Sequence, residues 1–464
     1  METRGLEPVP DSERTGRVRA LVPTWVGANL TMLLVTVGAG LAVLNGLNLW
    51  QVLAVAVTAS AIGFGLVGLV SIAGREGGAP GMALSRAVFG QRGNLLPGAL
   101  TWVARWGWET VNAVTGTYAV LAVLNLLLGV TGTHSLTVLT LLAFVGCSYL
   151  VSGLGLGALR LCCVWSSYLF GGVSLLVLVH LAGATDWQAV LGRPAGPASM
   201  MVAGVGTLVA GGISWAPSGP DFARYLPRTA SGAAMVGATV GGAGIVYVPM
   251  VLTGTVMAVA SPGLATAPDP VAFIGPLLPG WLSVPYLLTA VAGMVLINAM
   301  SLYSAGFTAQ TLGFTVPRAW AVGLNAAISL FLGSLLMMSA TGFLDSFVSF
   351  LALLSVTFSA WVGVFAADLL RGRAYDPAAL LDTTPAGAYW YTGGFCVPAV
   401  AAWGTGLVTG LLFTGVEWFA GPLSTTWIGH QGLGWAVTIT VSAALYAILP
   451  RPADRTGGDR SLHF

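Results

Sequence analysis

Residues 211–227 read GGISWAPSGPDFARYLP and interrupt an apolar run that covers residues 199–217. Within four positions this stretch places Pro217, Gly219 and Pro220. Proline removes a backbone donor and glycine loosens the backbone, so a regular helix cannot continue through the stretch. In lipid, irregular backbone survives only where protein buries it or water reaches it. Discontinuous helices of this kind form the midplane sites of secondary transporters, and a plain proline kink is the alternative interpretation.

The composition is that of a helical membrane protein. The chain has 464 residues, of which 56% are hydrophobic and only 7% are charged, whereas soluble domains contain about 25% charged residues. A β-barrel would instead show weakly alternating segments of about ten residues. The net charge of +2 gives no indication of a nucleic-acid partner. Residues 1–20 are polar, and we expect no cleavable signal peptide because they lack an apolar core.

The apolar runs predict about twelve transmembrane helices in an all-α polytopic protein. Each run is close to or above the roughly 20 residues that are needed to cross a bilayer. The runs cover residues 21–44, 48–73, 96–129, 135–154, 158–183, 199–217, 233–260, 284–312, 319–339, 343–368, 393–419 and 431–450. Polar tails precede and follow them, at residues 1–20 and 451–464.

The distribution of arginine predicts the orientation in the membrane. All 18 basic residues are arginines, and an N-terminus inside the cell puts nearly all of them in cytoplasmic links and tails. Only Arg193 then lies clearly outside, and Arg105 lies within a span. By the positive-inside rule, both termini are cytoplasmic and the lipid partner is the cell membrane. Residues 80–90 are too short and too polar to span, and we expect an amphipathic linker at the inner interface.

A second interrupted helix lies five spans before the first one described. Residues 23–31 read PTWVGANLT and again place small and polar residues in an apolar run. Two interrupted helices in corresponding positions indicate an inverted repeat with a site between its halves. We therefore predict one five-helix repeat at residues 21–183, a second at residues 199–368 and two additional helices at residues 393–450.

Glu109 is the clearest charged residue at membrane depth, within the sequence WGWETVNA of residues 106–113. Intramembrane charges are expensive and usually functional. Two interpretations stay open. Arg105, four residues earlier on the helix, could pair with Glu109 and satisfy both charges. Alternatively, Glu109 takes up and releases the proton that couples transport.

Aromatic and amide side chains indicate a site for a flat ring. Trp108 and Asn112 are four residues apart and share a helix face, while Trp215 lies at the helix break. Two indoles could clamp a ring, and a carboxamide supplies both a donor and an acceptor to its edge. Simple packing of Trp108 is the alternative, since the chain has 16 tryptophans. Asn298, inside an apolar run, could bond either a neighbouring helix or a ligand.

Other classes of protein find little support in the sequence. There is no Walker loop, the four histidines form no cluster, and the cysteines have no metal-ligand spacing. We expect no metal and no cofactor apart from a coupling ion. A membrane-embedded enzyme would require a titratable cluster, and a channel would require a continuous polar lining.

The motifs together resemble the nucleobase–cation symporter family, in its purine–cytosine permease branch, over nearly the whole chain. The residues that carry the resemblance are WVGANL at 25–30, SRAVFG at 85–90, Gly107-Trp108 with Asn112-Ala113, SWAP at 214–217, PDF at 220–222, RYLP at 224–227, Asn298 with Tyr303-Ser304, AAD at 366–368, and Tyr375-Asp376. The span-six motifs at 214–227 are the most specific of these.

The resemblance implies a LeuT-like fold of five plus five inverted helices, followed by two more, with alternating access around a midplane site. It implies a planar heterocycle as substrate: cytosine or a purine first, with a hydantoin, allantoin or vitamin-type ring as the alternative. The substrate-binding residues would be Trp108, Asn112, Trp215, Ser214, Asn298 and Asn29.

The coupling cation would be H⁺ or Na⁺, and its candidate residues are Glu109, Gly27, Ala28 and Ser301. One departure from the family favours the proton. Sodium-coupled relatives carry hydroxyl residues just before the span-eight asparagine, where this chain has Leu296 and Ile297. A hard cation prefers oxygen ligands, which these two side chains cannot supply.

Overall fold

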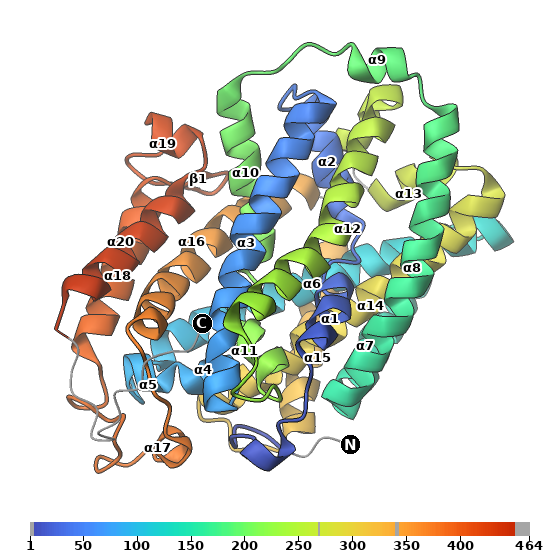
Figure 1. Cartoon of the computed structure of the whole chain (residues 1–464). Helices are drawn as coiled ribbons and strands as arrows, with labels where there is room; N and C mark the ends of the chain where they lie inside the picture. The colour runs from blue at the N-terminus through green and yellow to red at the C-terminus, as the bar shows by residue number, and fades with distance from the viewer. Residues whose placement is uncertain (1–3, 268–269, 339–342, 451–464) are drawn as a thin grey trace.

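A computed structural model describes residues 4–267, 270–338 and 343–450, with backbone alone for Ala272 and residues 343–348. The predicted tail at residues 451–464 lies outside the described residues. Helices form almost all of the described structure (Figure 1). They are α1 (Leu21–Gly27), α2 (Leu33–Val43), α3 (Leu49–Gly77), α4 (Gly81–Leu84), α5 (Arg86–Phe89), α6 (Leu95–Leu128), α7 (His134–Leu154), α8 (Leu156–Ala184), α9 (Trp187–Leu191), α10 (Ala198–Ile213), α11 (Gly219–Ala223), α12 (Gly232–Ala260), α13 (Pro270–Ile274), α14 (Gly280–Thr311), α15 (Arg318–Met338), α16 (Phe343–Leu370), α17 (Pro377–Leu381), α18 (Val397–Leu412), α19 (Trp427–His430) and α20 (Gly434–Ile448).

The predicted fold class is confirmed. Among the described residues, nine helical segments are long and apolar enough to cross a membrane, with α10 and α11 counted together. Three shorter apolar helices, α2, α18 and α20, correspond to the first and the last two predicted spans. The run at 393–419 extends beyond its helix, because α18 ends at Leu412 and a short hairpin of β1 (Gly415–Val416) and β2 (Phe419–Ala420) follows.

Local sequence signals set where several helices begin. Asn48 and Gln51 form a capping box at the start of α3, with bonds of 3.0 and 3.2 Å between each side chain and the other's backbone N–H. Thr133 and Ser231 cap α7 and α12 through their hydroxyl oxygens, both at 3.3 Å. These caps satisfy backbone donors that the first helical turn leaves without partners.

Glycine allows the helices around the two breaks to approach one another closely. A methyl group on Gly38 of α2 would clash with the backbone of Val251 on α12, and one on Gly254 would clash with Val35. The Gly63 Cα on α3 lies 3.0 Å from where a Cβ of Gly212 on α10 would be. Such small-residue contacts replace the hydrophobic effect as the cause of helix association in lipid. They join α2, α3, α10 and α12 into one tightly packed group.

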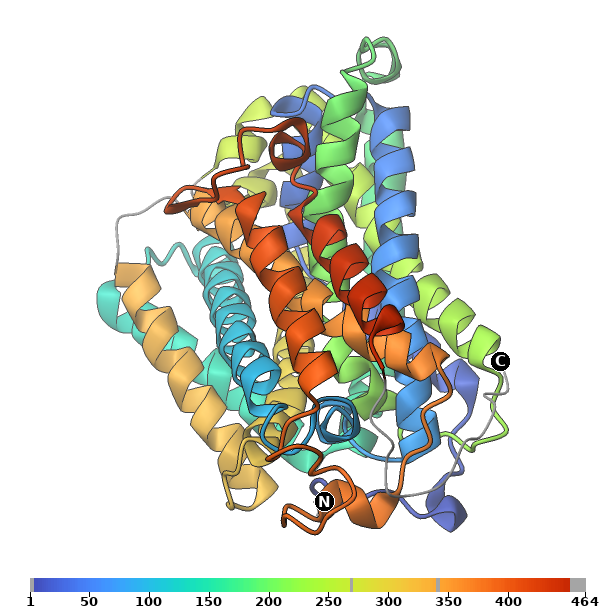
Figure 2. The same ribbon diagram turned by 90° about the vertical axis from the view of Figure 1, so that its left-hand side faces the viewer.

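The last two helices pack outside this group. Figure 2 shows α18 and α20 side by side at the front, along α16, and Figure 1 shows them at the left edge of the molecule. On the other side of the bundle, α6 packs against α14 and α15, and α7 packs against α14. The two additional helices, α18 and α20, therefore lie against the outside of the predicted repeats and not among their central helices.

Residues 80–90 are not an amphipathic linker at the interface, contrary to the sequence prediction. They form α4 and α5, and every residue from 77 to 90 is buried. Arg86 is accommodated because its guanidinium donates to the carbonyls of Leu380 and Thr311, at 3.1 and 3.0 Å. Burial lowers the pKa of Arg86 to about 10, so it stays charged at physiological pH. The Arg86 side chain therefore satisfies buried backbone carbonyls and does not extend to the membrane surface.

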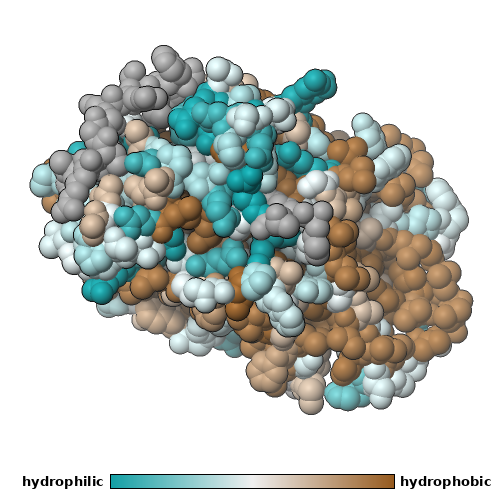
Figure 3. Space-filling model, turned by 90° about the horizontal axis from the view of Figure 1, so that it is seen from below, coloured by the Kyte–Doolittle hydropathy of each residue, from teal (hydrophilic) through white to brown (hydrophobic). Residues whose placement is uncertain are grey.

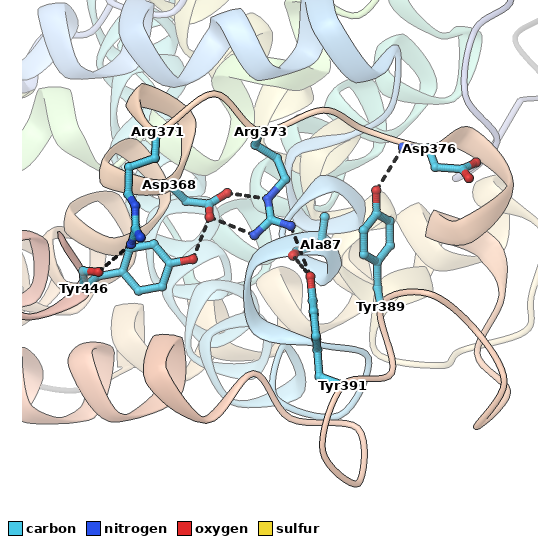
Figure 4. Close-up of polar contacts among 8 residues, drawn as sticks. All are labelled: Ala87, Asp368, Arg371, Arg373, Asp376, Tyr389, Tyr391 and Tyr446. Atoms are coloured by element: carbon cyan, nitrogen blue, oxygen red, sulfur yellow. Dashed lines mark hydrogen bonds and ion pairs between the residues drawn. The ribbon is translucent and has the colours of Figure 1, made fainter. Parts of the chain in front are cut away.

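A network of paired charges joins α16, α20 and α5 at the same end of the molecule (Figure 4). Asp368 accepts two hydrogen bonds from Arg373, at 2.7 and 2.8 Å, and a third from the Tyr446 hydroxyl at 2.6 Å. Arg373 also donates to Tyr391, whose hydroxyl donates to the Ala87 carbonyl at 2.7 Å. Burial alone would lower the pKa of Arg373, but the Asp368 carboxylate raises it well above its ordinary value. We refer to Asp368, Arg373, Tyr391 and Tyr446 as the terminal network.

This end of the molecule is polar. Arg14 from the N-terminal segment donates to the carbonyl of Arg75 at the end of α3, at 2.9 Å. Arg228 pairs with Asp11 at 3.2 Å. Figure 3, which looks at this end from below, shows hydrophilic residues gathered over much of it, next to a hydrophobic flank. Arg193 lies at the opposite end, where it donates to the Ala42 carbonyl at the end of α2.

Candidate substrate and cation site

The stretch at 211–227 breaks its helix. The α10 helix ends at Ile213, a 3₁₀ turn covers Ala216–Ser218, and α11 resumes at Gly219. Neighbouring backbone is pressed against the break, because a methyl group on Gly74 or Gly81 would clash with the carbonyls of Pro220 or Pro217. The irregular backbone is thus enclosed by α3 and α4 and screened from lipid.

Asp221 holds this break to a distant element. Its Oδ1 accepts a hydrogen bond from the Gly81 amide at 2.8 Å, 140 residues away in the chain. The α4 helix begins beside α11, and this first amide has no partner inside its own helix. The carboxylate therefore joins two short buried helices.

The first span is broken as well. The α1 helix ends at Gly27, and α2 begins at Leu33. Asn29 lies between them and donates from its amide to the Trp25 carbonyl at 2.8 Å. This bond satisfies a carbonyl that the end of α1 leaves open. Both breaks face α6 and α14.

A cavity with about 640 Å³ of empty space lies between the two breaks and these helices. The predicted site residues that line it are Ala28, Asn29, Trp108, Asn112, Ser214, Trp215 and Ser301. Asn298, Glu109 and Gly27 are fully or nearly fully buried and are not part of this lining.

Aromatic neighbours fix the two indoles. Trp108 meets Phe350 edge to face, with ring centroids 6.0 Å apart. Trp215 meets Trp25 in the same way at 6.2 Å, and the guanidinium of Arg105 lies over the Trp215 ring, 5.1 Å from its centre. One face of Trp215 is therefore taken by a cation. We expect Trp108 to be the indole on which a ring stacks.

Arg105 and Glu109 do not form a direct ion pair in the part of the chain that the structure describes. Arg105 Nη2 donates to the Ser214 carbonyl at 3.1 Å and to the Ser218 hydroxyl. Glu109 accepts a hydrogen bond from Ser301 at 3.2 Å through Oε1, and its Oε2 has no partner among the described residues. The i,i+4 pairing considered from the sequence is wrong, because the helix break offers Arg105 a carbonyl and a hydroxyl.

Asn298 is the predicted site residue that the structure leaves without a role. Its side chain is fully buried on α14, and neither amide atom finds a hydrogen-bond partner within the described ranges. A buried amide without partners is costly. Such a group is a strained feature, and a ligand or another arrangement of the helices would satisfy it.

Sequence reasoning missed much of the cavity wall, including two of its polar side chains, Tyr247 and Arg105. Tyr247 of α12 lines it and donates its hydroxyl to the Leu208 carbonyl. No local signal identifies that residue. Arg105 also lines the cavity, and its position three residues before Trp108 could have placed it on the same helix face.

Comparison with known proteins identifies the family. The family described as "permease for cytosine/purines, uracil, thiamine, allantoin" matches residues 8–429. The chain belongs to this nucleobase–cation symporter family. As a family member it is a multi-pass membrane transporter and not an enzyme.

Of two similar curated proteins, one matches nearly the whole chain and the other about half of it. The putative purine-cytosine permease YxlA of Bacillus subtilis is 23% identical over 97% of this chain and 96% of its own. The purine-cytosine permease FCY21 of Saccharomyces cerevisiae is 27% identical over 49% of this chain and 42% of its own.

Solved structures show the same fold. Mhp1, a nucleobase-cation-symport-1 family transporter in a closed conformation with bromovinylhydantoin bound, superposes with a TM-score of 0.74 at 18% identity, over 96% of this chain and 94% of that one. MhsT in complex with L-phenylalanine gives 0.57 at 12% identity, over 94% and 99%. The LeuT-like fold that the sequence predicted is therefore confirmed.

Proposed function

We propose that this permease imports a nucleobase, cytosine or a purine, together with a proton. One observation carries the proposal: the cavity between the two helix breaks is lined by Trp108 and Asn112, and Ser301 connects its wall to the buried Glu109. The cavity wall thus combines a stacking surface, Trp108, with an amide for the ring edge, Asn112. The titratable Glu109 lies one hydrogen bond behind that wall.

Recognition of the ring divides between two kinds of contact. Stacking on Trp108 accepts any flat ring, because every base has a π face. Asn112, one helical turn further along α6, presents both a donor and an acceptor to the ring edge. Ser214 and Asn29 border the same cavity from the two breaks. Their side chains already bond backbone carbonyls, at 2.7 and 2.8 Å, so we assign them a shaping role.

Proton coupling rests on the surroundings of Glu109. A carboxylate without a direct counter-ion in a low-dielectric site is costly, and uptake of a proton removes its charge. Ser301 donates to that carboxyl and also faces the cavity. A substrate that rotates the Ser301 hydroxyl toward itself would remove a hydrogen bond from Glu109. Proton occupancy and substrate occupancy are therefore linked through one hydroxyl.

The surroundings of Gly27 favour the proton over sodium. A Cβ on Gly27 would lie 2.8 Å from the Cys163 sulfur and 3.2 Å from the Leu296 side chain. Sulfur and methyl groups are poor ligands for a hard cation. The backbone carbonyls near Ala28 remain as oxygen donors, but the facing side chains of α14 and α8 add none there. This donor set fits sodium poorly.

The orientation follows from the arginines. Arg14, Arg75, Arg86 and Arg373 all lie at one end of the molecule, and Arg193 lies at the other. By the positive-inside rule, the arginine-rich end with the N-terminal segment faces the cytoplasm. Within this orientation we assign residues 21–183 and 199–368 to the two inverted repeats.

Uptake of labelled rings tests the proposal. Cells that lack their own permeases would express the chain and receive cytosine, hypoxanthine, uracil, allantoin or benzylhydantoin, with and without sodium and with a protonophore. We expect saturable nucleobase uptake that ignores sodium and is abolished by the protonophore. A sodium requirement would overturn proton coupling. Uptake of allantoin or a hydantoin alone would overturn the nucleobase assignment.

A further inference from the structure

We propose that Arg105 determines specificity, by selecting rings that present an oxo oxygen and not an amino group at the edge that faces it. The O6/N7 edge of a 6-oxopurine and the O2/N3 edge of cytosine are of this class, whereas adenine is not. This inference rests on the proposed function and narrows its substrate.

Arg105 keeps most of its hydrogen-bonding capacity unused. A guanidinium has five N–H donors. Nη2 uses its two on the Ser214 carbonyl and the Ser218 hydroxyl. Nε and Nη1 make no hydrogen bond to any described residue, and Nε is fully buried. The two Nη1 hydrogens are therefore the donors left beside the cavity.

The nearby carboxylates do not take up these donors. Asp221 Oδ1 is engaged by the Gly81 amide at 2.8 Å, and Glu109 Oε1 is engaged by Ser301 at 3.2 Å. Neither forms a direct ion pair with Arg105 within the described ranges. A fully buried guanidinium with donors left unpaired is costly, so the site favours a ligand that brings a further acceptor.

The guanidinium is held in a fixed position. The Nη2 bonds tie it to the helix break, and it lies over the Trp215 ring at 5.1 Å from the ring centre. Trp108, one turn further along the same helix, lines the same cavity. A ring stacked on Trp108 would thus meet the open donors of Arg105 with its edge.

The chemistry of the edge then decides which ring is accepted. Nη1 can donate to an oxo oxygen such as O6 of hypoxanthine, which is an acceptor. A bidentate pair would need an Nη2 hydrogen, and both of these are bonded to the helix break. Adenine presents an amino donor at the same place, which would face the cation and leave donors on both sides unpaired. Glutamine and asparagine, with one donor and one acceptor, pair with the adenine edge instead. Hypoxanthine and adenine differ at this position and form a matched pair of probes.

Competition in the wild type is the first test, since it needs no variant. Unlabelled hypoxanthine and adenine would compete with labelled cytosine uptake. We expect hypoxanthine to inhibit at a concentration about tenfold lower than adenine, because adenine would leave buried donors unpaired. Equal inhibition, or better inhibition by adenine, would overturn the inference.

Two variants assign the selectivity to Arg105. Arg105→Gln should lower the preference for hypoxanthine at least tenfold or reverse it toward adenine, and Arg105→Lys should keep the preference for hypoxanthine with weaker uptake. Arg318→Gln is the matched control, because Arg318 is also buried and bonds backbone carbonyls but does not line the cavity. An unchanged hypoxanthine-to-adenine ratio in Arg105→Gln would mean that Arg105 only braces the helix break.

The two proposals fail in different ways. If no ring is transported, the proposed function fails. If rings are transported but adenine competes as well as hypoxanthine, only the role of Arg105 fails. The ratio of two inhibition constants is independent of the amount of protein, so a variant that reaches the membrane poorly still reports on selectivity.

Discussion

The terminal network and the cavity both bury charged side chains, but they treat them in opposite ways. At the terminal network, Asp368 receives three hydrogen bonds, two from Arg373 and one from Tyr446 (Figure 4). At the cavity, Arg105, Glu109 and Asn298 retain polar atoms without partners among the described residues. A fully hydrogen-bonded network stabilises one structure, whereas unpaired donors and acceptors can bind a ligand. The difference separates a structural region from a binding region.

Breaking the terminal network should have the largest effect. Arg373→Met leaves the Asp368 carboxylate buried without its counter-ion, at a cost of about 3–5 kcal/mol. We expect a marked fall in monodisperse protein and in the melting temperature of the solubilised permease. The double variant Asp368→Leu/Arg373→Met removes both charges and should recover part of the loss. If Arg373→Met kept wild-type stability, the structural role of the network would be wrong.

Removing the stacking surface should affect transport without affecting folding. Trp108→Ala deletes a face worth about 1–3 kcal/mol per stacked base, which corresponds to a tenfold or larger loss of apparent affinity. Protein abundance at the membrane should stay near that of the wild type. Trp165→Ala is the control, since Trp165 is 61% exposed on the surface of α8. Unchanged affinity in Trp108→Ala would remove the stacking residue from the proposal.

The Glu109→Gln variant tests, through the pH dependence of uptake, whether Glu109 carries the coupling proton. Proton symport predicts that uptake by the wild type rises as the external pH falls, because more protons are available to accompany the substrate. A glutamine cannot carry the proton, so we expect uptake that no longer follows the pH gradient, while exchange of labelled for unlabelled substrate continues. Glu417→Gln, at an exposed carboxylate in the β1–β2 hairpin, should keep the wild-type profile. A full pH dependence in Glu109→Gln would exclude Glu109 as the coupling group.

The smallest effect is expected for Asn298→Ala. Removing a buried amide that has no partners should leave stability unchanged or raise it by about 1 kcal/mol. Thermal stability without substrate would show this, and substrate-induced stabilisation would show whether the amide serves the ligand. A fall in stability without substrate would mean that Asn298 is bonded in the resting protein. Asn298 would then be a structural residue, like those of the terminal network.

Local signals predicted most of the fold. Hydropathy identified the spans, and proline with glycine identified the break at Pro217–Pro220, because both act through the backbone of the residues that carry them. Trp108 and Asn112 were assigned to one cavity-facing side of a helix by their spacing alone. The fold class and both interrupted helices followed from features that need no knowledge of tertiary contacts.

The partners of the buried charges could not be predicted in the same way. Pairing with Glu109, four residues away, was one of two open interpretations, yet the bonds of Arg105 go to Ser214 and Ser218, more than 100 residues away. Residues 80–90 were expected at the interface, but distant carbonyls on α14 and α17 accept the hydrogen bonds of Arg86. A sequence shows that a charge needs a partner, and only the packing of the helices decides which one it finds.

The glycine contacts around the breaks have a mechanical consequence. A methyl group on Gly38 or Gly254 would overlap the backbone of the facing helix, and the approach of Gly63 to Gly212 is nearly as close, so α2 with α12 and α3 with α10 are in direct backbone contact. We therefore expect these helices, and the breaks they enclose, to move together. Asn29 and Trp215 belong to that group, whereas Trp108 and Ser301, on the other side of the cavity, belong to α6 and α14. The Arg105–Ser214 bond joins the two sides, so a motion that separates them would have to break it.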